Sequence, residues 1–182
     1  MSSYLSTIMS RRNANNRTSD DSLLGLIGHF PDVIEGRRLA EVQSGAHVIC
    51  RLVKNGSGGD LDIGKSVQYL VGSEMKEVDA YSGAGTYCDG IVDPDSGEAT
   101  VADDEHFLVV IGGVARGCIV GATTHAAGTA VKTGAAGILV ASSVDPTTAG
   151  YVGIVQTTTT VSGTAIDVLI DCRESVNATN QH

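Results

Sequence analysis

Aromatic residues are scarce in this sequence: its 182 residues include no tryptophan, two phenylalanines and five tyrosines. Flat aromatic side chains are the usual platforms for stacking sugars and bases, so their scarcity argues against glycan and single-stranded nucleic-acid binding. Proline is also rare, with three residues, whereas glycine is abundant, with 23. This balance is typical of short strands joined by many tight turns. The composition therefore predicts an all-β fold whose core is built from Val, Ile, Leu and Ala.

Positive charge is in deficit, because 12 basic residues face 21 acidic ones and the formal net charge is −9. Nucleic-acid binding depends mostly on a basic surface that displaces counterions, so we expect no nucleic-acid partner. The chain has no apolar run of membrane-spanning length, and its first residues lack the apolar core of a signal peptide. We expect one globular domain that has no membrane partner and is not exported by that route.

The four cysteines stand far apart in the sequence, at Cys50, Cys88, Cys118 and Cys172. They form no C-x-x-C pair and have no histidine at a spacing typical of zinc sites. Neither a zinc module nor a disulfide-rich secreted scaffold is indicated. We expect reduced thiols in a reducing compartment.

Three regions follow from the distribution of residue types. Residues 1–47 are predicted to form an N-terminal arm with short helices, residues 48–172 a β-rich body, and residues 173–182 a flexible C-terminal tail. Within the arm, Asp20 to Ser22 offer N-cap chemistry for a short helix over residues 23–27, and residues 32–42 predict a second short helix. Acidic and basic residues balance in the arm, so the excess of negative charge lies in the body and tail.

The body is a series of short strand-like runs separated by Gly, Asp and Asn, among them HFLVVI at 106–111 and RGCIVG at 116–121. An internal repeat organises these runs, because three stretches of the first half align with three of the second. The pairs are Gly64–Val67 with Gly128–Val131, Asp89–Val92 with Val152–Val155, and Phe107–Ile111 with Ile166–Ile170. We therefore predict two similar β-modules that pack into one small β-barrel or β-sandwich.

Residues Gly59–Ser66 fit the phosphate-loop pattern G-x-x-x-x-G-K-[ST]. In that motif, backbone amides at a helix N-terminus bind phosphate together with the lysine. Asp60 and Asp62 would put negative charge into an anion site, and the residues after Ser66 predict a strand rather than a helix. A small nucleotide-binding enzyme that uses Lys65 and Ser66 is therefore an alternative function and not the preferred one.

The other polar motifs predict no catalytic, metal or cofactor-binding residue. The chain has no G-x-S-x-G nucleophile elbow, and its histidines have unrelated surroundings. His106 follows Asp103, Asp104 and Glu105, which indicate a solvated turn before a strand. Residues 93–97 resemble the start of a calcium loop but lack the bidentate glutamate at its twelfth position. We expect a protein without a cofactor.

The first 19 residues combine basic and apolar side chains without any acidic residue. Such a segment either has no partner or docks onto an acidic, grooved partner by charge and apolar anchors together. The side chains concerned are Leu5, Ile8, Met9, Arg11, Arg12 and Arg17.

The stretch from about residue 60 to residue 172 resembles the small capsid decoration, or cement, proteins of tailed bacteriophages. Members of this family show a glycine-led valine strand, a Gly/Ala-rich hairpin, a second glycine-containing strand and a terminal apolar strand. The matching stretches here are Gly128–Thr133, Gly137–Ala141, Gly150–Val155 and Ala165–Ile170. The second predicted module matches this pattern better than the first.

The resemblance implies a non-enzymatic virion structural protein without a cofactor, a homotrimer on the capsid exterior that is assembled in the host cytoplasm. It would bind the outside of the phage head and bridge major capsid protein subunits, which stabilises the shell. Residues 1–47 depart from the shorter family members, so we expect the contacts there: Leu5, Ile8, Met9, Arg11, Arg12 and Arg17 with the shell, and Leu23, Leu24, Ile27 and Phe30 anchoring the arm to the body or to a neighbouring subunit. Another virion component, such as a tail or head-fibre protein, is a further alternative.

Overall fold

The computed structural model describes residues 20–33, 42–80, 88–94, 98–121, 124–142, 150–158 and 165–171. These residues are mostly β-strand, which confirms the predicted all-β class. Two short 3-10 helices, η1 (Asp21–Leu23) and η3 (Ala135–Gly137), accompany the strands. The strands are β1 (Ile27–Val33), β2 (Val42–Asn55), β3 (Leu61–Asp62), β4 (Ser66–Tyr69), β5 (Glu77–Ala80), β6 (Gly90–Val92), β7 (Thr100–Val101), β8 (His106–Ile119), β9 (Ala130–Thr133), β10 (Leu139–Ala141), β11 (Tyr151–Val155) and β12 (Ala165–Asp171).

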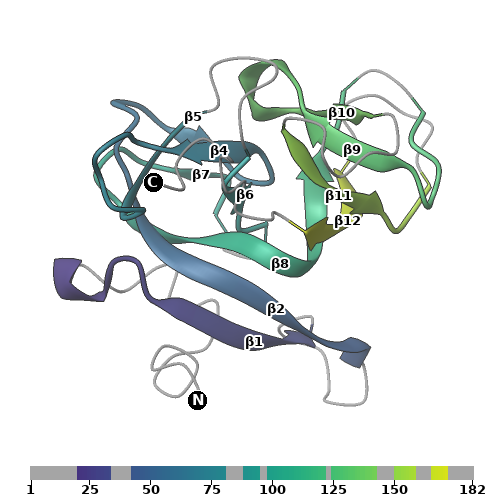
Figure 1. Ribbon diagram of the computed structural model, residues 1–182, viewed down its shortest axis with the longest axis horizontal. Helices are drawn as coiled ribbons and strands as arrows, with labels where there is room; N and C mark the ends of the chain where they lie inside the picture. The colour runs from purple at the N-terminus through teal and green to yellow at the C-terminus, as the bar shows by residue number, and fades with distance from the viewer. Residues whose placement is uncertain are drawn as a thin grey trace, which may run out of the picture.

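Ten of these strands form one sheet in the order β1-β2-β5-β4-β6-β8-β12-β11-β9-β10, and β3 pairs with β7 separately. A further pairing between β2 and β8 closes β2, β5, β4, β6 and β8 into a ring. Figure 1 shows that β8 runs from this ring into the second group of strands. The sequence predicts two strands in this region, but the structure joins them into the single strand β8.

The pairing register confirms the two predicted modules. In the first module, Val67 lies opposite Gly90, and in the second Val131 lies opposite Gly153. The next pairs also correspond, because Ile91 lies opposite Val110 and Ile154 lies opposite Leu169. All of these residues belong to the stretches that align in the sequence, so the repeat is one of strand pairing as well as of residue type.

The structure extends the repeat to positions with little sequence similarity. Asn55 pairs with Val78 in parallel, and Val120 makes the matching parallel bridge to Leu139. We define the first module as the C-terminal half of β2 with β4, β5, β6 and the first half of β8. The second module is the second half of β8 with β9, β10, β11 and β12. β8 therefore supplies the last strand of one module and the first strand of the other.

Two equivalent glycines explain why a Gly-Ile-Val strand occurs in each module. A Cβ atom added at Gly90 would lie 2.9 Å from the carbonyl oxygen of Val110, and one added at Gly153 would lie 2.0 Å from the carbonyl oxygen of Leu169. Val110 and Leu169 are themselves equivalent in the pairing register. Both modules thus need glycine where two backbones approach closely.

The core forms two clusters, and the larger one spans both modules, because it also includes Leu52, Ile91 and Val110 of the first. One cluster fills the interior of the first module and includes Val53, Val67, Val78, Val92, Phe107 and Val109. The equivalent side chains of the second module lie in the other cluster and are Cys118, Val131, Leu139, Val155, Ile166 and Val168. The cysteines among the described residues, Cys50, Cys88 and Cys118, are buried in this second cluster.

The predicted helix over residues 23–27 is wrong beyond Leu23. The side chain of Asp20 accepts a hydrogen bond of 2.9 Å from the amide of Ser22 and caps η1, but Ile27 already begins β1. The cause is the edge of β2, because the amide of Gly25 donates to the carbonyl of Leu52, and the amide of Leu52 donates to the carbonyl of Leu26. Tertiary pairing has overridden the local helix signal.

The second predicted helix, residues 32–42, is not supported at its ends, because residues 32–33 lie in β1 and Val42 begins β2. Residues 34–41 lie outside the described residues, as do residues 1–19 and 172–182. The predicted boundary after residue 47 falls inside β2, so the described part of the arm belongs to the sheet. None of the described helices is long and apolar enough to cross a membrane.

Candidate functional site

The residues predicted to contact the shell fall into two groups. Leu5, Ile8, Met9, Arg11, Arg12 and Arg17 lie outside the described residues. Leu23 and Leu24 are partly buried and pack against the core, Phe30 is 3% exposed within it, and Ile27 is partly buried at the start of β1. Leu23, Leu24 and Phe30 therefore lie against the body of their own chain. The contact of these residues and Ile27 with a neighbouring subunit stays a prediction.

The stretch Gly59–Ser66 does not have the geometry of a phosphate loop. It forms β3, a turn and the start of β4, with no helix after Ser66. The ammonium group of Lys65 forms a 2.5 Å ion pair with Asp62, and the hydroxyl of Ser66 donates to the carbonyl oxygen of Gly137 at 3.0 Å. Both candidate phosphate-binding side chains thus serve contacts within the protein.

A pocket of about 230 Å³ lies beside this stretch. Its charged lining consists of Asp60, Asp62 and Lys65, which places two carboxylates against one ammonium group. This lining repels a phosphate anion instead of attracting it. The pocket therefore gives no support to the nucleotide-binding alternative.

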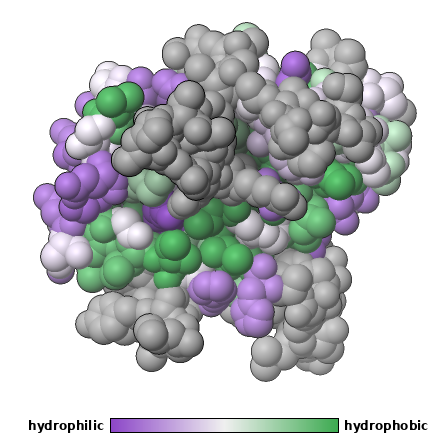
Figure 2. All heavy atoms as spheres, in the orientation of Figure 1, coloured by the Kyte–Doolittle hydropathy of each residue, from purple (hydrophilic) through white to green (hydrophobic). Residues whose placement is uncertain are grey.

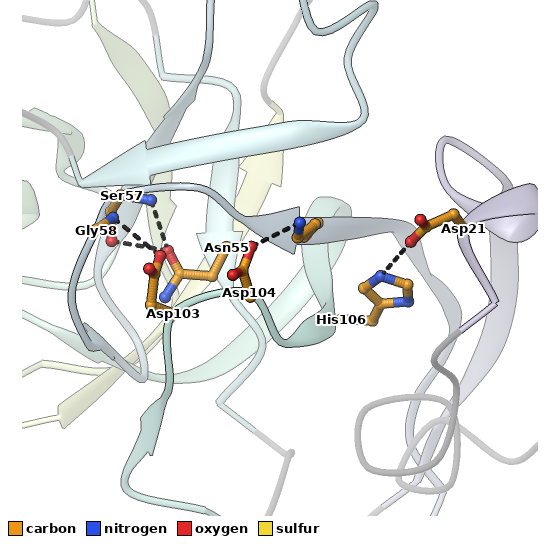
Figure 3. Close-up of polar contacts among 8 residues, drawn as sticks. Asp21, Asn55, Ser57, Gly58, Asp103, Asp104 and His106 are labelled. Carbon is orange, nitrogen blue, oxygen red and sulfur yellow. Dashed lines mark hydrogen bonds and ion pairs between the residues drawn. The ribbon is translucent and has the colours of Figure 1, made fainter.

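Another group of polar side chains holds two loops together at one end of the first module (Figure 3). Asn55 is fully buried and donates through its side-chain amide to the carbonyls of Gly59 and Val101, at 2.8 and 3.0 Å. The amide of Gly58 donates to the carboxylate of Asp103 at 2.9 Å. These bonds satisfy buried polar groups and fix the loop after β2, which is a structural role.

The predicted acidic turn before His106 is present, with Asp104 in the left-handed region at φ 65°. Asp104 accepts a hydrogen bond from the ammonium group of Lys54 at 2.6 Å, and this bond raises the pKa of Lys54. His106 itself points toward the N-terminal segment, where its Nε2 lies 2.9 Å from the carboxylate of Asp21 (Figure 3). The described residues contain no group of three His, Cys, Asp or Glu side chains suited to a metal ion.

The β4–β5 hairpin carries an apolar tip that the sequence reasoning missed. Val71 is fully exposed and Met75 is 40% exposed. Glu74 and Met75 both have left-handed backbone, at φ 55° and 62°, a conformation that non-glycine residues rarely adopt. The guanidinium group of the buried Arg51 donates to the sulfur of Met75 at 2.8 Å and to the hydroxyl of Tyr69 at 2.9 Å, which fixes this tip to the body.

The repeat contains a signal that could have revealed this tip. Tyr69 and Val78 flank the hairpin in the first module, and Thr133 and Leu139 are their equivalents in the second. The intervening segment is residues 70–77 in one case and residues 134–138 in the other, so the first module has the longer hairpin. On the face shown in Figure 2, apolar side chains gather in the lower middle, with hydrophilic residues at the left edge and directly below them.

No protein-family model matches the chain, and no curated protein is similar to it in sequence. Among solved structures, the chain is similar to the N base of head fiber gp8.5 in bacteriophage phi29. The two share 17% sequence identity, the match covers 66% of this chain and 92% of that chain, and the TM-score is 0.48.

Proposed function

We propose that the protein is a non-enzymatic virion structural protein of a tailed bacteriophage, a decoration or cement protein. It binds the outside of the phage head as a homotrimer and bridges major capsid protein subunits. The observation that carries the proposal is the resemblance of four stretches to decoration proteins. These stretches include or overlap β9, β10, β11 and β12, which are consecutive in the chain and neighbours in one module.

The polar contacts of the described residues are compatible with a structural role. Lys65 is paired with Asp62, Ser66 donates to a backbone carbonyl, and His106 lies against Asp21. Each of these contacts joins segments of the same chain. These side chains were the strongest candidates for chemistry in the sequence.

The shell contacts that we propose are the arm residues Leu5, Ile8, Met9, Arg11, Arg12 and Arg17, together with the hairpin tip of Val71 and Met75. A small exposed apolar tip gives a weak contact on its own. Many identical copies around a closed shell convert weak contacts into firm attachment, because each bound subunit raises the effective concentration of the next contact.

The test is to purify phage particles and quantify this chain against the major capsid protein in DNA-filled heads. A constant ratio that follows the symmetry of the shell is expected. A few copies at one vertex or on the tail would contradict the cement function and favour a tail or head-fibre component, and absence from particles would overturn the virion proposal. Val71→Asp should lower occupancy without lowering the melting temperature, whereas Thr100→Asp, at an exposed position on β7, is the matched control.

A further inference from the structure

The chain contains a single Asn-Gly pair, Asn55–Gly56, where β2 ends and a loop begins. This dipeptide is especially prone to deamidation, because glycine leaves the backbone free to bend back toward the asparagine side chain. In that reaction the backbone nitrogen of Gly56 bonds to Cγ of Asn55, the bond from Cγ to Nδ2 breaks, and ammonia leaves with the amide proton of Gly56. Water then opens the cyclic imide to give aspartate or isoaspartate.

Four hydrogen bonds hold the side-chain amide of Asn55 in the folded protein. Its nitrogen donates to the carbonyl oxygens of Gly59 and Val101, at 2.8 and 3.0 Å. Its oxygen accepts from the backbone amide and the hydroxyl of Ser57, at 3.0 and 2.7 Å (Figure 3). Because Asn55 is 0% exposed, both polar atoms of the side chain are satisfied within the protein and water does not reach them.

The backbone around the pair is held as well. The amide of Gly56 donates to the carbonyl oxygen of Val78 at 2.9 Å, and Asn55 exchanges backbone bonds of 2.9 Å with Glu105 and Asp104. Deamidation requires the Gly56 nitrogen to lose its proton and to approach Cγ of Asn55. Both steps break bonds of the folded state, so the reaction proceeds from an opened loop and its rate follows the population of that open state.

The second module shows that strand pairing does not require an asparagine here. Val120 is equivalent to Asn55, because each residue pairs in parallel with the strand after the hairpin. The next residue is glycine in both modules, and the amides of Gly56 and Gly121 each donate to that strand at 2.9 Å. The amide group of Asn55 therefore serves the two loops that it joins and not the sheet.

From these contacts we infer that Asn55 is a latent deamidation site, which the fold protects and whose product does not fit the folded arrangement. A carboxylate at this position would place an oxygen, in place of the NH₂ group, against the carbonyl oxygens of Gly59 and Val101, away from water. One opening event that ends in deamidation thus releases both loops irreversibly. The inference concerns the isolated chain and does not depend on the proposed capsid role.

The first test measures the conversion of Asn55 by peptide mass spectrometry, in full-length protein kept in mildly alkaline buffer. The folded protein should react more slowly than the same protein in guanidinium chloride, by about tenfold or more, because only its open fraction reacts. Equal rates in the two conditions would overturn the inference.

Asp103→Ala tests whether loop opening controls the rate, because it removes the 2.9 Å bond between Asp103 and the amide of Gly58. The rate in the folded protein should rise about fivefold, since a solvated hydrogen bond worth roughly 1 kcal/mol shifts the open population by that factor. In guanidinium chloride the variant should match the parent. Glu74→Ala, which removes an exposed carboxylate from the β4–β5 hairpin, is the matched control and should leave the rate unchanged. No effect of Asp103→Ala, or an equal effect of Glu74→Ala, would contradict protection by these loops.

Asn55→Asp tests the product directly. Its melting temperature should fall by about 8 °C or more, because an uncompensated buried charge is strongly destabilising. Gln156→Glu makes the same chemical change at an exposed position and should stay within about 2 °C of the parent. A melting temperature of Asn55→Asp equal to that of the parent would show that the product fits the fold and would overturn this part of the inference.

Discussion

The hydroxyl of Ser66 donates a hydrogen bond of 3.0 Å to the carbonyl oxygen of Gly137, and this bond joins the first module to the second. Ser66 is 1% exposed, so water does not replace the bond if it is lost. The equivalent residue of the second module is Ala130, which pairs with Ile154 as Ser66 pairs with Ile91. Alanine can therefore occupy this position within a module, and the hydroxyl of Ser66 is needed for the contact between the two modules.

We expect Ser66→Ala to lower the free energy of unfolding by about 1 kcal/mol, the usual net value of one buried hydrogen bond. Chemical denaturation monitored by circular dichroism measures this change. Ser22→Ala, at an exposed position on η1, should change the stability by less. Equal stability of Ser66→Ala and the parent protein would show that the bond does not hold the modules together.

Gly153→Ala is expected to destabilise the protein strongly, by about 3 kcal/mol or more, because its Cβ would overlap the carbonyl oxygen of Leu169. Gly90→Ala should have a similar effect, since its Cβ would overlap Val109 and approach the carbonyl of Val110. Gly59→Ala is the control, with no atom within 4 Å of the added Cβ, and should stay within about 0.5 kcal/mol. Thermal unfolding of the three variants tests the claimed equivalence of the two modules directly.

The cap of η1 predicts a pH dependence at the N-terminal segment. Hydrogen bonds from the hydroxyl and the backbone amide of Ser22 lower the pKa of Asp20 below its ordinary value. A carboxyl group with a lower pKa in the folded state stabilises the fold above its unfolded-state pKa, and this contribution is lost as the pH falls through the folded-state pKa. An NMR titration of the Asp20 carboxyl carbon should show the lowered pKa, and Ser22→Ala should move it back upward. An unshifted pKa in the parent protein would contradict the capping geometry.

Deletion of residues 1–19 is expected to leave the fold intact, because the described sheet begins at Ile27 and β1 pairs with β2 along residues 27–33. Binding to particles should fall, since the arm supplies proposed shell contacts. Circular dichroism checks the fold, and co-sedimentation with capsids that lack the protein checks binding. Equal occupancy of truncated and full-length protein would remove the arm from the proposed interface.

Nucleotides are expected to leave the stability unchanged. A ligand that binds only the folded state raises its stability according to ligand concentration and affinity, so binding would appear as a higher melting temperature. Millimolar ATP or GTP with magnesium should give no shift, because Lys65 is paired with Asp62 and no helix follows Ser66. A shift that Lys65→Ala abolishes would restore the phosphate-loop interpretation.

The sequence was sufficient to predict the fold class and the two modules, because both depend on residue patterns that survive in each copy. Gly-Ile-Val recurs at Gly90 and Gly153 since a close backbone approach excludes any side chain there. The register of β4 with β6 and of β9 with β11 then follows from the same aligned residues. Close packing restricts which residues can occupy a position, so structural features that depend on it can be predicted from the sequence.

The N-terminal segment was harder to predict, because the cap at Asp20 and the leucines after it are a genuine helix signal. What converts residues 27–33 into a strand is the edge of β2, whose Arg51 pairs with Ile27 from 24 residues further along the chain. The continuity of β8 was missed for a related reason. Gly112 and Gly113 indicate a break between two strands, but β8 continues through them beside β2. Glycine is required at Gly113, since a Cβ atom there would lie 2.3 Å from the carbonyl oxygen of His47.

The candidate surfaces were the least predictable part. Val71 and Leu169 look like ordinary strand or hairpin residues in the sequence, and only their exposure distinguishes them.

Because β8 is common to both modules, no cut in the chain can separate them without dividing a strand. A fragment that ends after the first module would lose the second half of β8, and a fragment that begins with the second module would have to start in the middle of it. The two halves should therefore unfold in a single cooperative transition, and neither can be inherited, expressed or exchanged as an independent unit. A third module could be added only by using β12 as its first strand, just as β8 serves the second.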